Sequence, residues 1–250
     1  MAKYTGMFPY RGTIGGVTCC ETKNGIILKQ KSSLNKERIM KDARFSRTRE
    51  NIAEFSTSAK SNKLIRQAVM GLRWAKDPSL LGRLTREVMA AIKQDPINPR
   101  GARNLQDGPA EMLKGFNLNE RAKLENKFHL HQDVTIKRKS GVVMISLPLF
   151  EPLYAISAPD GATHYRLVTA VSEIDFKSEW RETSCKETEM LVLDNNPVLP
   201  MSRSHTIPKN TRQIIFVFLG IQFFRKQNEE FAPVSGGSGD PLCIIEVSKG

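Results

Sequence analysis

Residues 213–224 read QIIFVFLGIQFF, and this stretch decides the fold. The longest apolar run of the chain lies inside it, from Ile214 to Ile221, eight residues with Gly220 among them. A helix that crosses a bilayer needs roughly 20 apolar residues, so the run is far too short to be one. Its β-branched and aromatic residues are typical of a buried strand. We therefore expect a central strand here and no membrane span.

More short strands surround this segment in the C-terminal half, separated by clusters of Pro, Gly, Asn and Ser. They are predicted at residues 134–138, 142–147, 164–174, 189–193 and 242–247. The first two flank Lys139-Ser140-Gly141, which suits a tight hairpin turn. A flexible loop is expected at 235–240, before the last strand. The pattern favours an antiparallel β-sandwich.

The N-terminal residues predict a β-hairpin. Thr13, Ile14 and residues 17–22 are strand-like on one side of Lys23-Asn24-Gly25, and residues 26–29 are strand-like on the other. Asn-Gly is the preferred pair for a two-residue turn because both positions need a positive φ.

Between the hairpin and the strands the period is helical, and helices are expected at 34–42, 48–74 and 77–92. Asp77-Pro78 suits the start of the third helix, and Asp95-Pro96 suits its end. The short connection before Asp77 favours an antiparallel helical hairpin. The second helix has apolar residues at steps of three and four, which predict its buried face: Ile52, Phe55, Ala59, Ile65, Ala68, Val69 and Leu72.

These segments predict an α+β fold with three parts. An N-terminal hairpin and a basic helical region occupy residues 1–94. Residues 95–115 are expected to be a linker, because 95–110 contain three prolines and two glycines. A β-sandwich-like domain is expected at 116–250.

The charge is divided unevenly along the chain. Residues 1–115 hold 22 Lys and Arg against 10 Asp and Glu, whereas residues 116–250 hold 16 of each, so the net +12 belongs to the first half. Such asymmetry indicates an acidic partner, either nucleic acid or another protein subunit. Solubility alone is the simpler alternative. The candidate partner-binding residues are Arg44, Arg47, Arg49, Lys60, Lys63, Arg66, Arg73, Arg83 and Arg86.

Motifs for catalysis are not evident. The sequence has no Gly-x-Ser-x-Gly, His-Glu-x-x-His or Walker-type loop. His129 and His131, with Glu125 or Asp133, form only a weak metal pattern, and two polar residues on a solvated strand face explain it more simply. The four histidines, which include His164 and His205, are not expected to converge in a catalytic pocket. We expect no enzyme activity, cofactor or metal.

The cysteines and the N-terminus bear on the compartment. Cys19, Cys20, Cys185 and Cys243 form neither a dense disulfide framework nor a metal knuckle. The first residues show no charged leader followed by an apolar run. A cytoplasmic protein with reduced thiols is therefore expected.

Several segments resemble an uncharacterised family of Bacteroidota proteins. They are GTIGGVTCCETKNGIILKQK (12–31), KERIMKDARFSRTRENIAEF (36–55), INPRGARN (97–104) and SAPDGATHYRLVTA (157–170). The resemblance implies a common plan of a glycine-rich hairpin, a basic middle containing RTREN and a β-rich end. It implies no activity and no site residue.

Taken together, the residues favour a structural protein that self-associates or docks on an acidic partner through its basic helices. The alternative is sequence-independent binding of nucleic acid. The basic helices lack the recognition-helix signature of known DNA-binding motifs, which places that alternative second.

Overall fold

A computed structural model describes residues 2–3, 12–22, 25–30, 34–72 and 77–250, with the backbone alone at 2, 3, 235 and 237. It has 28% helix and 37% strand, with antiparallel sheets, and this confirms the α+β prediction with a β-rich C-terminal half. The chain divides into two compact units, Met1–Asn51 and Ile52–Gly250.

The first unit contains a four-stranded antiparallel sheet in the order β1-β4-β3-β2. Strands β3 (Val17–Thr22) and β4 (Gly25–Gln30) form the expected hairpin, whose turn residues Lys23 and Asn24 lie outside the described residues. Two further strands extend it, β1 (Ala2–Lys3) beside β4 and β2 (Gly12–Ile14) beside β3.

One face of this small sheet carries a group of apolar side chains, here called its apolar face. Residues directly opposite each other on antiparallel strands share a face. The register pairs Ile14 with Val17 and Cys19 with Leu28, so these four side chains share a face, which Glu21 and Gln30 border. Among the described residues of the first unit only Cys19 is buried. The apolar face therefore has no core beneath it among these residues.

Helices follow the sheet. They are α1 (Lys36–Lys41), a short 3-10 turn (Ala43–Phe45) and α2 (Ser46–Ala68), which begins in the first unit and continues into the second. Asn35 caps α1 by accepting a hydrogen bond from the Arg38 backbone N–H at 2.8 Å.

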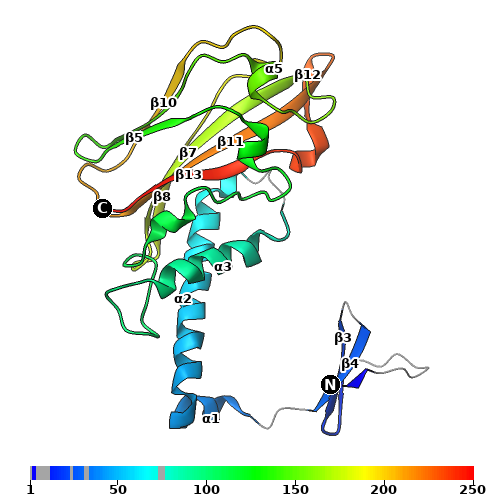
Figure 1. Ribbon diagram of the computed structural model, residues 1–250, viewed down its shortest axis with the longest axis vertical. Coiled ribbons are helices and arrows are strands. Elements are labelled where there is room, and N and C mark those ends of the chain that lie inside the picture. Colours follow the sequence, from blue (N-terminus) through cyan, green and yellow to red (C-terminus); the bar gives the residue numbers. More distant parts are fainter. Residues whose placement is uncertain (1, 4–11, 23–24, 31–33, 73–76) are drawn as a thin grey trace. The chain divides into compact units, whose positions relative to one another are not determined.

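In the second unit α2 leads to a 3-10 turn (Met70–Leu72), and α3 (Leu80–Lys93) follows after Asp77. The Asn62 side chain joins the two helices by donating to the Leu81 carbonyl and the Thr85 hydroxyl. Figure 1 shows α3 crossing α2 steeply, so the pair is crossed and not aligned antiparallel.

A six-stranded sheet forms the centre of the second unit. Its longest strands, β7 (His164–Asp175) and β11 (Ile214–Gln227), pair antiparallel from Ile174–Ile214 to His164–Phe224. Shorter strands pair with the outer edges of these two. Strands β13 (Leu242–Ser248) and β12 (Glu230–Pro233) both pair with the free edge of β11. Strands β8 (Trp180–Glu187) and β9 (Leu191–Val192) both pair with the free edge of β7.

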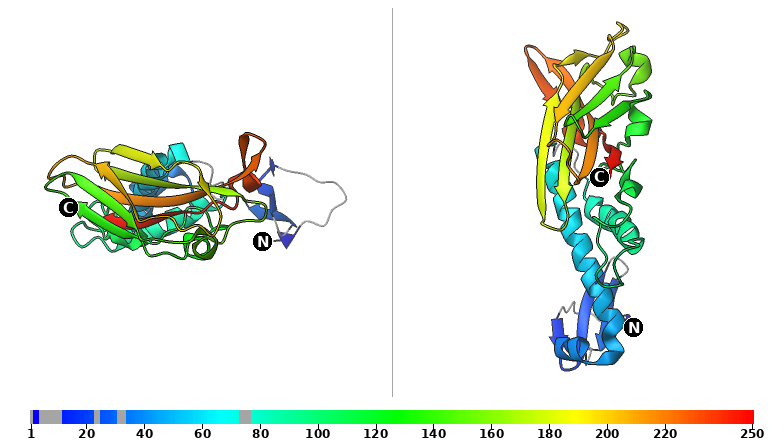
Figure 2. Two further views of the ribbon diagram at one scale, coloured as in Figure 1. Left: turned by 90° about the horizontal axis from the view of Figure 1, so that it is seen from above. Right: turned by 90° about the vertical axis from the view of Figure 1, so that its left-hand side faces the viewer.

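A second sheet lies over the first. It contains β5 (Asp133–Lys137), β6 (Val142–Leu147) and β10 (Met201–Thr206) in the order β10-β6-β5. Figures 1 and 2 show the two sheets as adjacent layers, with α3 and the C-terminal end of α2 beside the larger sheet. Single-turn elements complete the unit: 3-10 turns at Ala110–Leu113 and Val234–Gly237, and the short helices α4 (Leu124–Lys127) and α5 (Pro152–Ala155).

The central strand β11 is buried on both faces. Phe216 and Phe218 pack with the helices, whereas Ile215 and Val217 pack toward the three-stranded sheet. A strand covered on both sides gains from apolar residues at every position, and this explains why its sequence is a continuous apolar run and does not alternate. The prediction of a central buried strand is confirmed.

Strand β1 of the first unit was not predicted from the sequence, and neither were β8, β10 and β12 of the second unit. Strands β8 and β10 have the sequences WRETSCKE and MSRSHT, in which polar residues dominate because one face of each is open to solvent. Strand β12 has only four residues, too few for a clear pattern.

The expected linker at 95–115 is packed onto the second unit. Leu105, Ala110 and Leu113 belong to its buried core. Prolines and glycines do bend the segment, but the Asp95 carboxylate accepts hydrogen bonds from the backbone N–H groups of Ile97 and Asn104. The segment is therefore a packed loop, and the compact units divide at Asn51 and not near residue 95.

Two leucines of α3 provide a matched test of this packing. Leu84 is fully buried between helix and sheet, whereas Leu81 is 56% exposed. We expect Leu84→Ala to lower the free energy of unfolding by about 2–5 kcal/mol, because it leaves a cavity. Leu81→Ala should change it by less than about 0.5 kcal/mol. Urea denaturation of both variants measures the difference, and equal losses would contradict this core.

Candidate interaction surfaces

Three of the candidate arginines point into solvent. Arg44, Arg47 and Arg86 have side chains that are 78%, 70% and 77% exposed. Each pairs with an acidic residue close to it in sequence: Asp42, Glu50 and Glu87 respectively. Exposed pairs of this kind contribute little to stability, so these guanidinium groups remain accessible to a partner.

Arg83, in contrast, has a structural role. Its side chain is 17% exposed and its guanidinium lies 5.0 Å from the centre of the Phe116 ring. It donates to the backbone carbonyl of Asn117 at 2.9 Å and to Asp77 at 2.5 Å. Burial acts to raise the pKa of Asp77, but hydrogen bonds from Ser79 and Arg83 hold it well below its usual range. Arg83 therefore fixes the loop after residue 115 to α3, and its guanidinium is largely used within the chain.

Other candidates also have partners within the chain. Arg49 donates from one nitrogen to the carbonyls of Ile39 and Asp42, and in this way closes the C-terminal end of α1. Lys60 Nζ lies 2.6 Å from a carboxylate oxygen of Glu179, and Arg66 Nε donates a hydrogen bond to Asn62 at 2.7 Å. Lys63 is exposed. Arg73 lies outside the described residues.

The first half of α2 reverses the expected amphipathicity. Ile52 and Phe55 are 53% and 57% exposed, whereas Glu54 and Asn62 are buried. Glu54 is stabilised there because its carboxylate accepts a hydrogen bond from the Gly101 N–H at 3.0 Å. The apolar stripe predicted from spacing is therefore wrong for Ile52, Phe55 and Ala59.

The second half of α2 agrees with the prediction, because Ile65, Ala68, Val69 and Leu72 are buried. In the first half of α2, the polar residue Glu54 faces the interior because it has a hydrogen-bond partner there. The spacing of apolar residues does not reveal such a partner.

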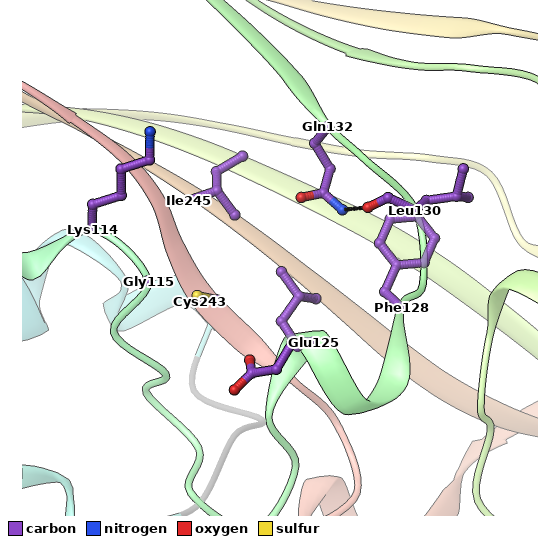
Figure 3. Close-up of a pocket in the computed structure, with 9 residues that line it drawn as sticks. Lys114, Gly115, Glu125, Phe128, Leu130, Gln132, Cys243 and Ile245 are labelled. Carbon is purple, nitrogen blue, oxygen red and sulfur yellow. Dashed lines mark hydrogen bonds between the residues drawn. The ribbon is translucent and has the colours of Figure 1, made fainter.

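A pocket of about 390 Å³ opens beside β13 (Figure 3). Its apolar walls come from α4 and the segment before β5, and from Cys243 and Ile245 on β13. Lys114 at its rim pairs with Glu246 at 2.6 Å, and the Glu125 carboxylate accepts a hydrogen bond from Asn117 at 2.9 Å. The polar groups at the rim thus have partners in the chain, and the pocket offers mainly apolar contacts.

Cys243 in this pocket is not a ready nucleophile. Burial, together with the nearby Glu125 carboxylate, raises the pKa of its thiol to about 12. The reactive form of cysteine is the thiolate, which is scarce at neutral pH under these conditions.

The four histidines lie in different surroundings. His129 bonds to Ser157, His131 lies 3.3 Å from Asp133, and His164 bonds to Thr163. Within the described part of the chain no group of three or more His, Cys, Asp and Glu is arranged to hold a metal ion.

His205 is fully buried and joins three strands. Its ring nitrogens lie 2.9 Å from the Thr169 hydroxyl on β7 and 3.0 Å from the Ser184 hydroxyl on β8. Burial, assisted by Lys186, lowers the pKa of His205 to about 4. The ring is therefore neutral at pH 7 and connects the two sheets through hydrogen bonds.

The comparisons with known proteins add no identity. Neither the models of known protein families nor the curated proteins contain a match to this chain. Across the described residues, none of the helices has both the length and the apolarity needed to span a bilayer.

Two buried groups give opposite pH dependences of stability. Asp240 is 1% exposed, and burial raises its pKa to about 7, so its contribution to stability is present at low pH and is lost as pH rises through about 7. The lowered pKa of His205 acts in the other direction, because its contribution is present above pH 6.5 and is lost as pH falls through about 4. Between about pH 4 and 6.5 a rise in pH therefore lowers the contribution of Asp240 to stability and raises that of His205.

In the Asp240→Asn variant, we expect the free energy of unfolding to show the pH dependence that comes from His205 alone. The free energy of unfolding of this variant should rise between pH 4 and 6.5 by up to about 3 kcal/mol, at 1.36 kcal/mol per pKa unit. His205→Gln should show the reverse slope, which comes from Asp240. Urea denaturation across this pH range measures both, and parallel profiles for the two variants would contradict the assignment.

Proposed function

We propose that this chain is a non-enzymatic structural protein that associates with copies of itself, and that its basic N-terminal unit makes the contact. The apolar face of the N-terminal sheet is the observation that carries this proposal. Ile14 is 68% exposed and Val17 is 41% exposed. A sheet with one apolar face is stable when another layer covers that face.

Burial of this face in a contact with another copy contributes favourable free energy to association. Complete burial of one large aliphatic side chain is worth about 1.5–3 kcal/mol. A contact that covers Ile14, Val17 and Leu28 therefore supplies several kcal/mol, from which the loss of translational and rotational freedom is subtracted.

Charge decides what kind of surface suits the N-terminal unit. Residues 1–51 hold 11 Lys and Arg against 4 Asp and Glu, whereas residues 52–250 hold 27 against 22. Face-to-face stacking of two N-terminal sheets would bring two strongly basic units together, and like charges oppose such a contact. An acidic surface elsewhere on the partner is the favourable match.

Nucleic acid binding is the second candidate. The exposed guanidinium groups of Arg44, Arg47 and Arg86 support it, because Arg neutralises phosphates and releases counterions. This candidate leaves the apolar sheet face unexplained and so ranks below self-association.

Substitution of the apolar face tests the proposal. We expect Ile14→Thr with Val17→Thr to weaken self-association at least tenfold, because threonine keeps the strand propensity but removes apolar surface. Thr13→Ser, on the opposite face of the same strand, is the control and should associate like the parent. Light scattering after size exclusion, over a range of concentrations, gives the oligomer mass. A parent chain that is monomeric at every concentration would sink the proposal.

Fluorescence anisotropy with duplex DNA distinguishes the second candidate. A nucleic acid contact through Z phosphates predicts that log affinity falls with log salt with a slope of about −0.9Z. Arg44→Gln, Arg47→Gln and Arg86→Gln together should then reduce the slope. Self-association predicts no such binding, and tight salt-dependent DNA binding by an otherwise monomeric chain would replace the first proposal with the second.

A further inference from the structure

One end of the β-sandwich has a group of exposed apolar side chains, here called the distal patch. Its members are Leu149, Leu153, Tyr154 and Leu199, whose exposures are 54%, 50%, 78% and 74%. Helix α5 contributes two of them, and Figure 1 shows it at the end of the sandwich where the chain also enters β10. None of these residues was singled out from the sequence.

Backbone contacts bring the members of the distal patch together. Phe150 and Val198 form an antiparallel bridge, which places the neighbouring Leu149 and Leu199 across from each other. The Leu153 N–H donates to the Asp194 carbonyl at 3.2 Å, which ties α5 to the same connection. Contiguous apolar patches on folded domains commonly mark interaction sites.

Two acidic residues adjoin the distal patch. Glu151 lies in the chain between Leu149 and Leu153, and Asp194 accepts the Leu153 N–H through its backbone carbonyl. Residues 149–154 and 194–199, which contain the four members of the patch, hold these two carboxylates and no Lys or Arg. The distal patch is therefore an apolar surface on acidic segments of the chain.

We propose that the distal patch binds the basic N-terminal unit of a second copy of this chain, so that copies join head to tail. The inference deepens the proposed self-association by naming the surface that covers the N-terminal sheet. Apolar residues meet apolar residues in this contact, and the acidic segments meet a unit with an excess of positive charge.

Two other contacts between copies would bring like charges together. Patch against patch would bring acidic segments together. The exposed apolar residues of α2, Ile52 and Phe55, lie on a helix that also exposes Lys60 and Lys63, so this stripe repels a basic unit. The distal patch is the apolar surface whose charge complements the N-terminal unit.

The geometry has a consequence for assembly. The two surfaces of the proposed contact are different, so the contact is heterologous, and each copy offers one of each. Head-to-tail addition then continues into rings or open chains.

A mixing experiment on the full chain tests the inference. The patch variant carries Tyr154→Ser and Leu199→Ser, and the sheet variant carries Ile14→Thr and Val17→Thr. We expect each variant alone to be mainly monomeric. Mixed in equal amounts, they should form a complex of two chains and no larger species, because the intact sheet of the patch variant binds the intact patch of the sheet variant. Sedimentation velocity resolves these species.

Controls separate the contact from a folding defect. Tyr154 and Leu199 are strongly exposed, so the patch variant should unfold at the same urea concentration as the parent. Ile97→Ser removes another exposed apolar side chain, 70% exposed, and should assemble like the parent. Glu151→Lys, which leaves the apolar residues in place, should weaken assembly at least several-fold at low salt, and the difference from the parent should shrink as salt rises.

The outcomes of the mixing experiment distinguish failure of the distal patch from failure of self-association itself. If the patch variant assembles like the parent while the sheet variant does not, the distal patch is not the partner surface and self-association itself stands. If both variants dissociate and their mixture stays monomeric, the head-to-tail contact is overturned. If neither variant changes the assembly of the parent, both the inference and the apolar-face explanation fail.

Discussion

The antiparallel pairing of β7 with β11 is the constraint on which the second unit depends. The two strands pair over eleven positions and are covered on both faces, so burial favours apolar or hydrogen-bonded side chains along them. The helices cover one face and the three-stranded sheet covers the other. His205 has a hydroxyl partner at each ring nitrogen, whereas the buried hydroxyl of Tyr165 has no hydrogen-bond partner among the described residues.

The first unit is subject to the opposite condition. Its strands are short, its apolar face has a single buried residue among those described, and most of its charge has one sign. The second unit has its own buried core, whereas the described residues of the first unit bury only Cys19. This contrast is the physical reason for placing self-association ahead of catalysis in the proposed function.

Sequence reasoning succeeded where one physical effect dominates. The buried strand at Ile214–Ile221 and the pairing of β3 with β4 were predicted correctly, because double-sided burial and turn-forming residues restrict the choice of residue strongly. It failed where tertiary partners decide. Glu54 is buried because Gly101 donates to it from 47 positions away, and Arg83 is removed from the surface by carbonyls of a distant loop. The distal patch depends on a bridge between Phe150 and Val198, which no local pattern reveals.

The position of the β7–β11 ladder also has a mechanical consequence. The helices pack near its Ile174–Ile214 end, and the apolar contacts around Phe150 and Ala155 lie near its Tyr165–Phe223 end. Strands β7 and β11 begin at opposite ends of this ladder, so a pull on the start of one against the start of the other acts along the strands and loads the hydrogen bonds in shear, all of them at once. Such a domain resists stretching far better than one whose strands are peeled apart one bond at a time.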